Sequence, residues 1–400
     1  MALSTSQLAA TNSSHGTVIP VFSLSRQYDA IKDEVHAAMD RVLASQQFIG
    51  GPEVEQFETE AAQFLGVGAV VGCASGTDAL WLALQAAGVE PGDSVLTTPF
   101  SFFASASSIA RCGARPVFAD IDPETLNLDP ASAEPVLKKS GAKLVKVIMP
   151  VHLYGQCADM RSFLQLGEAF GAAVLEDAAQ AFGANWCDGM AGGFGHAAGF
   201  SFYPTKNLAA YGEAGCVTTN DPEFAALLRR LRNHGSSRRY YHEEFGWNSR
   251  LDALQAAILR VKLRHLDEWN DHRRAIAARY TSSLQQSGLT AKGIVRPSGQ
   301  APIAPLEVRP EAFHVFHQYV VRAHRRDELR VFLSGRGIGT EIYYPLPLHL
   351  QEAFAYLGYE KGAFPEAEHA ASEVVALPMF PELTEEEQRR VVSAIAEFYS

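Results

Sequence analysis

Between residues 69 and 219, short apolar runs alternate with segments whose apolar residues have helical spacing. The apolar runs have the length of β-strands, and there are seven: 69–73, 94–97, 116–119, 144–149, 173–176, 197–202 and 215–219. Parallel strands need a crossover of a dozen or more residues between them, usually a helix. The alternation therefore predicts an α/β fold with a mostly parallel seven-stranded sheet and helices on both of its faces.

The rest of the chain is divided by changes in this pattern. Residues 1–18 are polar and lack the charged and then apolar segments of a signal peptide, so we expect a flexible tail. A long helical pattern runs from Leu251 to about Gln285 and precedes an irregular, proline-containing segment at 293–310. We predict a large domain over 19–262, and a linking helix with a small C-terminal α/β domain over 263–400.

Composition argues against several classes of partner. The formal net charge is −11, which disfavours nucleic acid and anionic membranes, since both attract positive patches. No segment has the roughly 20 consecutive apolar residues of a membrane span. The five cysteines are isolated, as in proteins of the reducing cytoplasm, and no metal-ligand pattern with a third ligand accompanies His314 and His317.

Three motifs at expected strand ends suggest a cofactor site. Lys206 follows the 197–202 run, and the hydroxyl of Ser201 precedes it by five residues. A lysine placed in this way can attach to an aldehyde cofactor, with the serine binding the cofactor's phosphate. Gly76 and Thr77 begin a helical pattern, where free N–H groups and the helix dipole favour a phosphate, although an ordinary helix cap is equally compatible.

Asp177 supplies the third part of this pattern. It ends the apolar run 173–176, at the edge where open α/β sheets bind ligands. A carboxylate there can pair with a pyridine nitrogen and keep it protonated, although capping is the commoner use of aspartate. Taken with Lys206 and the 76–77 turn, Asp177 predicts a pyridoxal phosphate site.

With these residues, the chain resembles the DegT/DnrJ/EryC1/StrS family of pyridoxal phosphate-dependent aminotransferases, which have the fold-type I architecture and act mostly on nucleotide sugars. The similarity runs from about Ile19 to the C-terminus. The stretches that carry it are 48–52 (FIGGP), 75–80 (SGTDAL), 98–102 (TPFSF), 150–156 (PVHLYGQ), 176–180 (EDAAQ), 246–252 (GWNSRLD) and 344–351 (YPLPLHLQ).

The resemblance implies roles for eight residues in binding the cofactor. Lys206 would attach to it covalently and move protons, Asp177 would pair with the pyridine nitrogen, Gln180 would hydrogen-bond the phenolic oxygen, Phe102 would stack on the ring, and Gly76, Thr77, Ser201 and Asn248 would bind the phosphate. Asn248 would reach the cofactor of a neighbouring subunit, which implies a homodimer.

The resemblance also implies L-glutamate as amino donor and a nucleotide-linked keto-hexose as acceptor. Ser249 stands where members acting at carbon 4 have an aromatic residue, so we favour a dTDP-linked 3-keto-6-deoxyhexose. A UDP-linked 3-keto sugar and a 4-keto sugar stay open, and Lys206 disfavours a dehydratase. The candidates for substrate contact, which are equally compatible with structural roles, are His152, Tyr154, His317, Tyr344 and His349.

Overall fold

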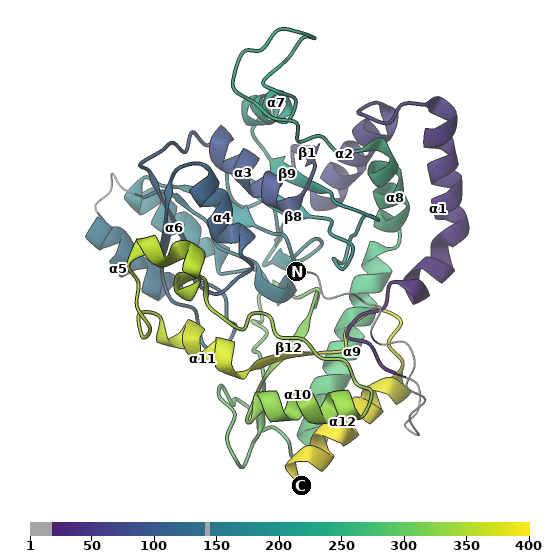
Figure 1. Cartoon of the computed structure of the whole chain (residues 1–400), viewed down its shortest axis with the longest axis vertical. Coiled ribbons are helices and arrows are strands. Elements are labelled where there is room, and N and C mark those ends of the chain that lie inside the picture. The colour runs from purple at the N-terminus through teal and green to yellow at the C-terminus, as the bar shows by residue number, and fades with distance from the viewer. Residues whose placement is uncertain (1–17, 141–144) are drawn as a thin grey trace.

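The computed structural model describes residues 18–140 and 145–400, so the predicted tail lies outside the described residues except for Val18. Its main sheet has seven strands in the order β1-β9-β8-β5-β4-β2-β3 (Figure 1). Their bounds are β1 Ala69–Cys73, β2 Ser94–Thr97, β3 Arg115–Phe118, β4 Val145–Ile148, β5 Ala173–Asp177, β8 Ala197–Ser201 and β9 Gly215–Thr219. Only β9 runs antiparallel to its neighbours, β1 and β8. The predicted α/β class with a mostly parallel seven-stranded sheet is confirmed.

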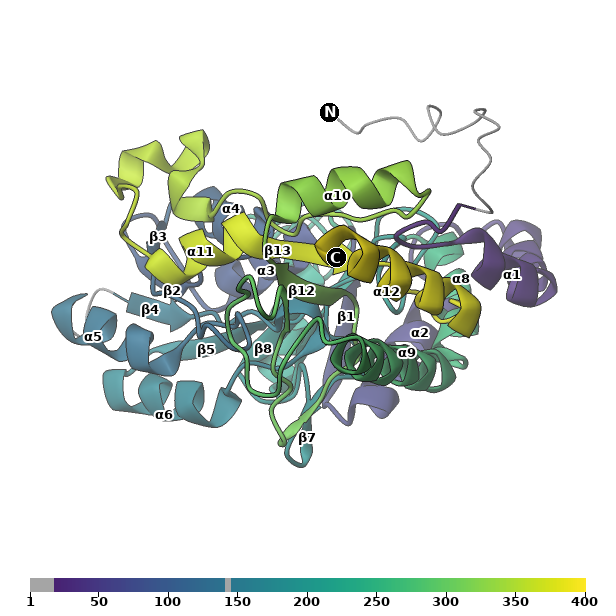
Figure 2. The same cartoon turned by 90° about the horizontal axis from the view of Figure 1, so that it is seen from below.

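Helices cover both faces of this sheet (Figure 2). One face packs on apolar residues of α3 (Gly76–Ala86), α4 (Ala104–Arg111) and α7 (Pro222–Leu231). The other face is covered at the β4 side by α5 (Pro130–Ser140) and α6 (Met160–Phe170), and at the β9 side by α1 (Ser25–Ser45), α2 (Pro52–Leu65) and α8 (Ala253–Leu263). This packing buries the sheet, as its continuous apolar strands require.

The C-terminal part contains a smaller antiparallel sheet in the order β10-β12-β13. Its elements are α9 Leu266–Gln286, β10 Ile303–Pro305, β12 Tyr319–Ala323, α10 Arg326–Gly335, α11 Pro365–Glu373, β13 Val374–Leu377 and α12 Glu385–Tyr399. Ile19 packs in the core of this part, and its N–H donates to the Gly337 carbonyl at 2.9 Å. The segment at Ile19 therefore joins the C-terminal core, while the division near residue 262 stays a prediction.

Two expectations about this part differ from the structure. The helical pattern from Leu251 to Gln285 forms two helices, because Arg264 and His265 bond to carbonyls three residues back and make a tight turn between α8 and α9. The segment expected to be irregular contains β10, an edge strand that ends at Pro305. Neither described range holds a helix long and apolar enough to cross a membrane.

Several short elements complete the fold. A third sheet joins the two halves of the chain, since β6 (Asn185–Trp186) pairs with both β7 (Gly189–Met190) and β11 (Ala312–Phe313). Short 3₁₀ helices lie at Leu153–Gly155, Leu348–Leu350 and Glu352–Leu357. The first of these follows β4, and the second places Leu348 N–H at 2.7 Å from the Pro99 carbonyl after β2. The C-terminal part is thus tied directly to the strand ends of the main sheet.

Candidate active site

A cavity of about 470 Å³ lies where β5 and β8 end and where the loops after β2 and β4 begin. It brings together seven of the eight residues predicted to bind a cofactor: Gly76, Thr77, Phe102, Asp177, Gln180, Ser201 and Lys206. Asn248, the eighth, is exposed and does not line the cavity of its own chain. The position matches the edge at which open α/β sheets bind ligands.

Asp177 and Lys206 are two of the charged residues that line this cavity. Asp177 is 3% exposed, and its Oδ2 and Oδ1 accept hydrogen bonds from Ser105 Oγ at 2.6 Å and Ala179 N at 3.2 Å. Burial raises the pKa of this carboxyl, while both hydrogen bonds and the charge of Lys206 oppose the rise. Burial also lowers the pKa of the Lys206 amine to about 8, so a neutral amine is available near neutral pH.

The start of α3 forms an anion site at one end of the cavity. Ser75 Oγ caps the helix by accepting from Asp78 N at 3.1 Å, and the helix geometry leaves the N–H groups of Gly76 and Thr77 without intrahelical acceptors. A Cβ on Gly76 would lie 2.5 Å from Ser201 Cβ, so only glycine allows this close approach. The turn and the Ser201 hydroxyl therefore gather donors that suit a phosphate.

The middle of the cavity suits a flat ring with an acceptor oxygen. Gln180 Oε1 accepts from Tyr154 N at 2.6 Å, which fixes the amide so that Nε2 donates to the Tyr344 hydroxyl at 3.0 Å. Phe102 is 56% exposed, although it is a large apolar ring, and its centroid lies 6.2 Å from that of Tyr344. A ring-stacking surface, an oriented amide donor, a carboxylate and an anion site together fit pyridoxal phosphate.

His317 and Tyr344, both expected to contact substrate, line the cavity. His317 is 7% exposed, and its Nδ1 has no hydrogen-bond partner. Burial lowers the pKa of its imidazole well below the usual value, and the charges of Lys206 and Arg273 add to this effect. The imidazole is therefore neutral, and its buried Nδ1 is unpaired.

The other three expected substrate contacts, His152, Tyr154 and His349, are not among the residues that line the cavity, so their contact with substrate stays a prediction. His152 is fully buried and bonds Glu176 Oε2 at 2.9 Å through Nε2. The Tyr154 hydroxyl donates to the Tyr343 carbonyl, and His349 bonds Glu368. Each of these side chains therefore already has a polar partner within the chain.

Other lining residues were missed by the sequence analysis. Those with polar groups include Ser105, Tyr203, Glu213, Gln318 and Tyr343. A signal existed for Ser105, because Ser101 precedes it by one helical turn just after β2. No comparable signal pointed to Gln318, since its position depends on how the C-terminal part packs over the main sheet.

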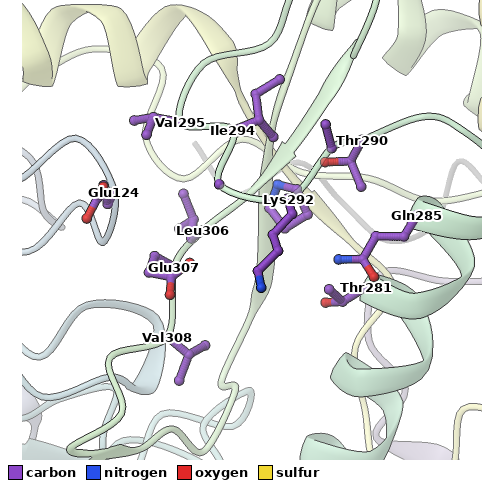
Figure 3. Close-up of a pocket in the computed structure, with 13 residues that line it drawn as sticks. Glu124, Thr281, Gln285, Thr290, Lys292, Ile294, Val295, Leu306, Glu307 and Val308 are labelled. Atoms are coloured by element: carbon purple, nitrogen blue, oxygen red, sulfur yellow. The ribbon is translucent and has the colours of Figure 1, made fainter.

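A second cavity, of about 300 Å³, lies beside the C-terminal end of α9 (Figure 3). Thr281, Gln285, Lys292 and Glu307 are among the residues that line it. Its lining contains no predicted site residue, no aromatic ring and no helix N-terminus. It therefore does not fit pyridoxal phosphate, although it contains a lysine.

A model of the DegT/DnrJ/EryC1/StrS aminotransferase family matches residues 29–396. The chain belongs to this family. The predictions of the family, of its enzyme class and of pyridoxal phosphate as cofactor are confirmed. The roles of individual residues stay predictions.

Relatives and solved structures align with this chain over nearly its whole length. It is 50% identical to a "pleiotropic regulatory protein" of Geobacillus stearothermophilus, covering 95% of this chain and 98% of the relative. It is 41% identical to a dTDP-3-amino-3,4,6-trideoxy-α-D-glucose transaminase of Streptomyces venezuelae, over 95% and 96%. The crystal structure of S. venezuelae DesV with a ketimine intermediate matches with a TM-score of 0.89 at 40% identity, over 96% and 99% of the two chains.

Proposed function

We propose that this protein transfers an amino group from L-glutamate to a keto-hexose linked to a nucleoside diphosphate. The observation that carries the proposal is that Lys206, Asp177 and the Gly76–Thr77 turn face one cavity, in a chain of this aminotransferase family. The S. venezuelae transaminase supports a dTDP-linked 3-keto-6-deoxyhexose as acceptor. The product would enter deoxyamino-sugar biosynthesis, for a surface polysaccharide or a glycosylated natural product.

The residues of the cavity would hold the cofactor by four of its functional groups and by one face of its ring. Lys206 would attach to its aldehyde carbon, and Asp177 would accept a hydrogen bond from its ring nitrogen. Gln180 Nε2 would donate to its phenolic oxygen, in the direction already set by the bond to Tyr154 N. The α3 turn and Ser201 would bind its phosphate, and Phe102 would cover one face of its ring.

Pyridoxal phosphate, when bound, carries the amino group between the two substrates and spreads the negative charge left on the donor's α-carbon. The Lys206 amine takes the proton from that carbon and moves it within the cavity as general base and then general acid. Asp177 keeps the ring nitrogen protonated. His317 and Tyr344, which line the cavity, would contact the sugar. L-glutamate and the keto sugar are thereby converted to 2-oxoglutarate and the amino sugar.

Adding L-glutamate to the purified holoenzyme without sugar tests this proposal. We expect the visible absorbance of the Lys206-bound cofactor to be replaced by near-ultraviolet absorbance, with one 2-oxoglutarate released per site. Candidate sugars then distinguish the acceptors: recovery of the visible band is expected with a dTDP-linked 3-keto sugar, and not with its 4-keto isomer. If the visible band recovers only with a UDP-linked sugar, the nucleotide of the acceptor is UDP and not dTDP. If the enzyme does not respond to glutamate, a regulator or a dehydratase is favoured instead of an aminotransferase.

We further propose that the active unit is a homodimer. The loop between α7 and α8 projects from the molecule (Figure 1) and exposes large aromatic side chains, with Tyr240 79% and Phe245 93% exposed. Exposed aromatic residues that gather on one projecting loop suggest a surface that another protein chain covers. Asn248 lies at the base of this loop, next to Ser249, whose hydroxyl donates to Asp78 Oδ2 at 2.8 Å. A second copy of the chain would place Asn248 at the neighbouring phosphate site.

Mixed dimers test whether Asn248 acts on the partner's site. Asn248→Ala should weaken pyridoxal phosphate binding about tenfold, since a hydrogen bond to a charged group is lost. An equal mixture of Asn248→Ala and Lys206→Ala chains, reassociated at limiting cofactor, should regain about a quarter of wild-type activity, because half of the dimers carry one intact site. A mixture no more active than its better parent would place Asn248 in its own chain's site.

We place the reaction in the cytoplasm. All five cysteines are free: Cys73, Cys112, Cys157, Cys187 and Cys216. Cys187 is exposed, and an exposed thiol stays reduced most readily in a reducing compartment.

A further inference from the structure

Two buried hydroxyl groups form a short chain behind Asp177. Ser105, in the first turn of α4, is 1% exposed and its Oγ lies 2.6 Å from Asp177 Oδ2. Ser101, in the loop before α4, is 3% exposed and its Oγ lies 2.8 Å from Ser105 Oγ. Both serines line the cavity, and neither belongs to the predicted cofactor-binding set.

The direction of these hydrogen bonds follows from the chemistry of the groups. An ionised carboxylate only accepts, so Ser105 donates its single proton to Asp177. The Ser105 oxygen can then only accept, so Ser101 donates to Ser105. The two bonds reinforce each other, because a hydroxyl that accepts a hydrogen bond is a stronger donor.

This arrangement matters because Asp177 is almost wholly buried. Burial raises the pKa of its carboxyl, and the Ser105 hydrogen bond is the largest of the effects that oppose the rise. Ser105 and Ala179 N also bond different oxygens of the carboxylate, which fixes the orientation of its plane. A protonated carboxyl would lose the negative charge that favours a protonated ring nitrogen, and a rotated carboxyl would no longer present its oxygen in the direction of the ring N–H.

We propose that Ser105, supported by Ser101, is a positioning residue that holds the Asp177 carboxylate in the orientation that receives the ring N–H of the cofactor. The inference rests on the proposed function, since it assigns Asp177 to the ring nitrogen. Ser105 does not touch the reacting atoms and acts only through Asp177.

The test compares Ser105→Ala with three other variants. Ser105→Thr keeps the hydroxyl, and Ser105→Cys keeps the volume but is a weak donor. Ser108→Ala is the matched control, because Ser108 is also fully buried on α4 but its hydroxyl donates only to the Ser105 backbone carbonyl at 3.3 Å. The readouts are the Kd of the apo protein for pyridoxal phosphate, the pH at which the visible absorbance of the holoenzyme titrates, and the thermal unfolding of the apo protein.

We expect Ser105→Ala and Ser105→Cys to weaken pyridoxal phosphate binding by about tenfold or more, since each loses a strong hydrogen bond to a carboxylate. Both should also shift the titration of the visible band. Ser105→Thr should retain most of the wild-type cofactor affinity and a nearly wild-type titration of the visible band. Ser108→Ala should leave the affinity and the titration unchanged, while lowering the unfolding temperature to a similar extent as Ser105→Ala.

Wild-type affinity and wild-type titration in Ser105→Cys would overturn the proposal, even if Ser105→Ala does not fold. Equal losses in Ser105→Ala and Ser108→Ala would also overturn it, because they would indicate a packing effect of α4. Failure of the wild-type enzyme to respond to glutamate is a different result, since it would overturn the proposed function and not the Ser105–Asp177 contact.

Discussion

Lys206→Ala is expected to abolish multiple-turnover transamination, lowering kcat by at least about 10⁴-fold, while the fold is retained. The variant removes both the covalent attachment of the cofactor and the amine that moves the proton, and proton transfer by a positioned group alone contributes up to about 10⁴-fold. Glutamate-dependent formation of 2-oxoglutarate measures the loss, and circular dichroism checks the fold. Retained turnover would contradict the assignment of Lys206.

Lys262→Met is the matched control for this variant. Lys262 is 1% exposed, and burial lowers the pKa of its amine to about 8, as it does for Lys206. Its Nζ lies 4.3 Å from the centroid of the Tyr211 ring, and it does not line the cavity. Both lysines are desolvated and have a lowered pKa. If only the Lys206 variant loses transamination, the loss follows from the position of Lys206 in the cavity and not from its lowered pKa.

The pH dependence of cofactor attachment gives a second readout for Lys206. Only the neutral amine is a nucleophile, and its pKa in the apo protein is lowered to about 8. The rate at which the visible band forms on adding pyridoxal phosphate to apo protein should therefore rise with pH and level off above about 8. A rate that keeps rising toward the pKa of an ordinary lysine would show that burial does not activate this amine.

The fold was largely predictable because strand and helix periodicities are local. The seven strands of the main sheet are apolar runs that can be recognised from their own residues, but their order is not local. β9 lies between β1 and β8 and is antiparallel to both, which nothing in the 215–219 run indicates. Two-residue strands such as β6 (Asn185–Trp186) are too short to have a period.

The grouping of the candidate site residues in one cavity was predictable for a related reason. Asp177 and Ser201 end parallel strands, and such ends meet at one edge of a sheet, so residues far apart in the sequence could be placed together. The direction in which a side chain points could not be predicted in this way. His152 is hydrogen-bonded through its backbone N–H to the Asp177 carbonyl at 3.0 Å, yet its ring points away to Glu176. The proposed role of Asn248 depends on a second copy of the chain, which the sequence indicated only through resemblance.

Asp177→Asn should lower kcat for the glutamate half-reaction by about 10² to 10³-fold, the range seen when a single electrostatic stabiliser is removed. Asparagine keeps the shape of the side chain but not its charge, so the ring nitrogen is no longer held protonated and charge from the donor's α-carbon is less well stabilised. The change acts on the reaction and much less on glutamate binding, so KM should change little. Stopped-flow absorbance of the half-reaction measures both.

Asp159→Asn is the control, since Asp159 caps α6 by accepting from Ser162 N at 3.2 Å and asparagine caps equally well. Lys206 is intact in Asp177→Asn, so the visible band should form on adding cofactor, whereas Lys206→Ala should lack it. If Asp177→Asn attaches the cofactor but transfers the proton slowly, the roles of the two residues are separated. Lys206 is needed for both attachment and proton transfer, whereas Asp177 is needed mainly for proton transfer. An Asp177→Asn enzyme with wild-type kcat would mean that this carboxylate does not serve the ring nitrogen, and the inferred role of Ser105 would fail with it.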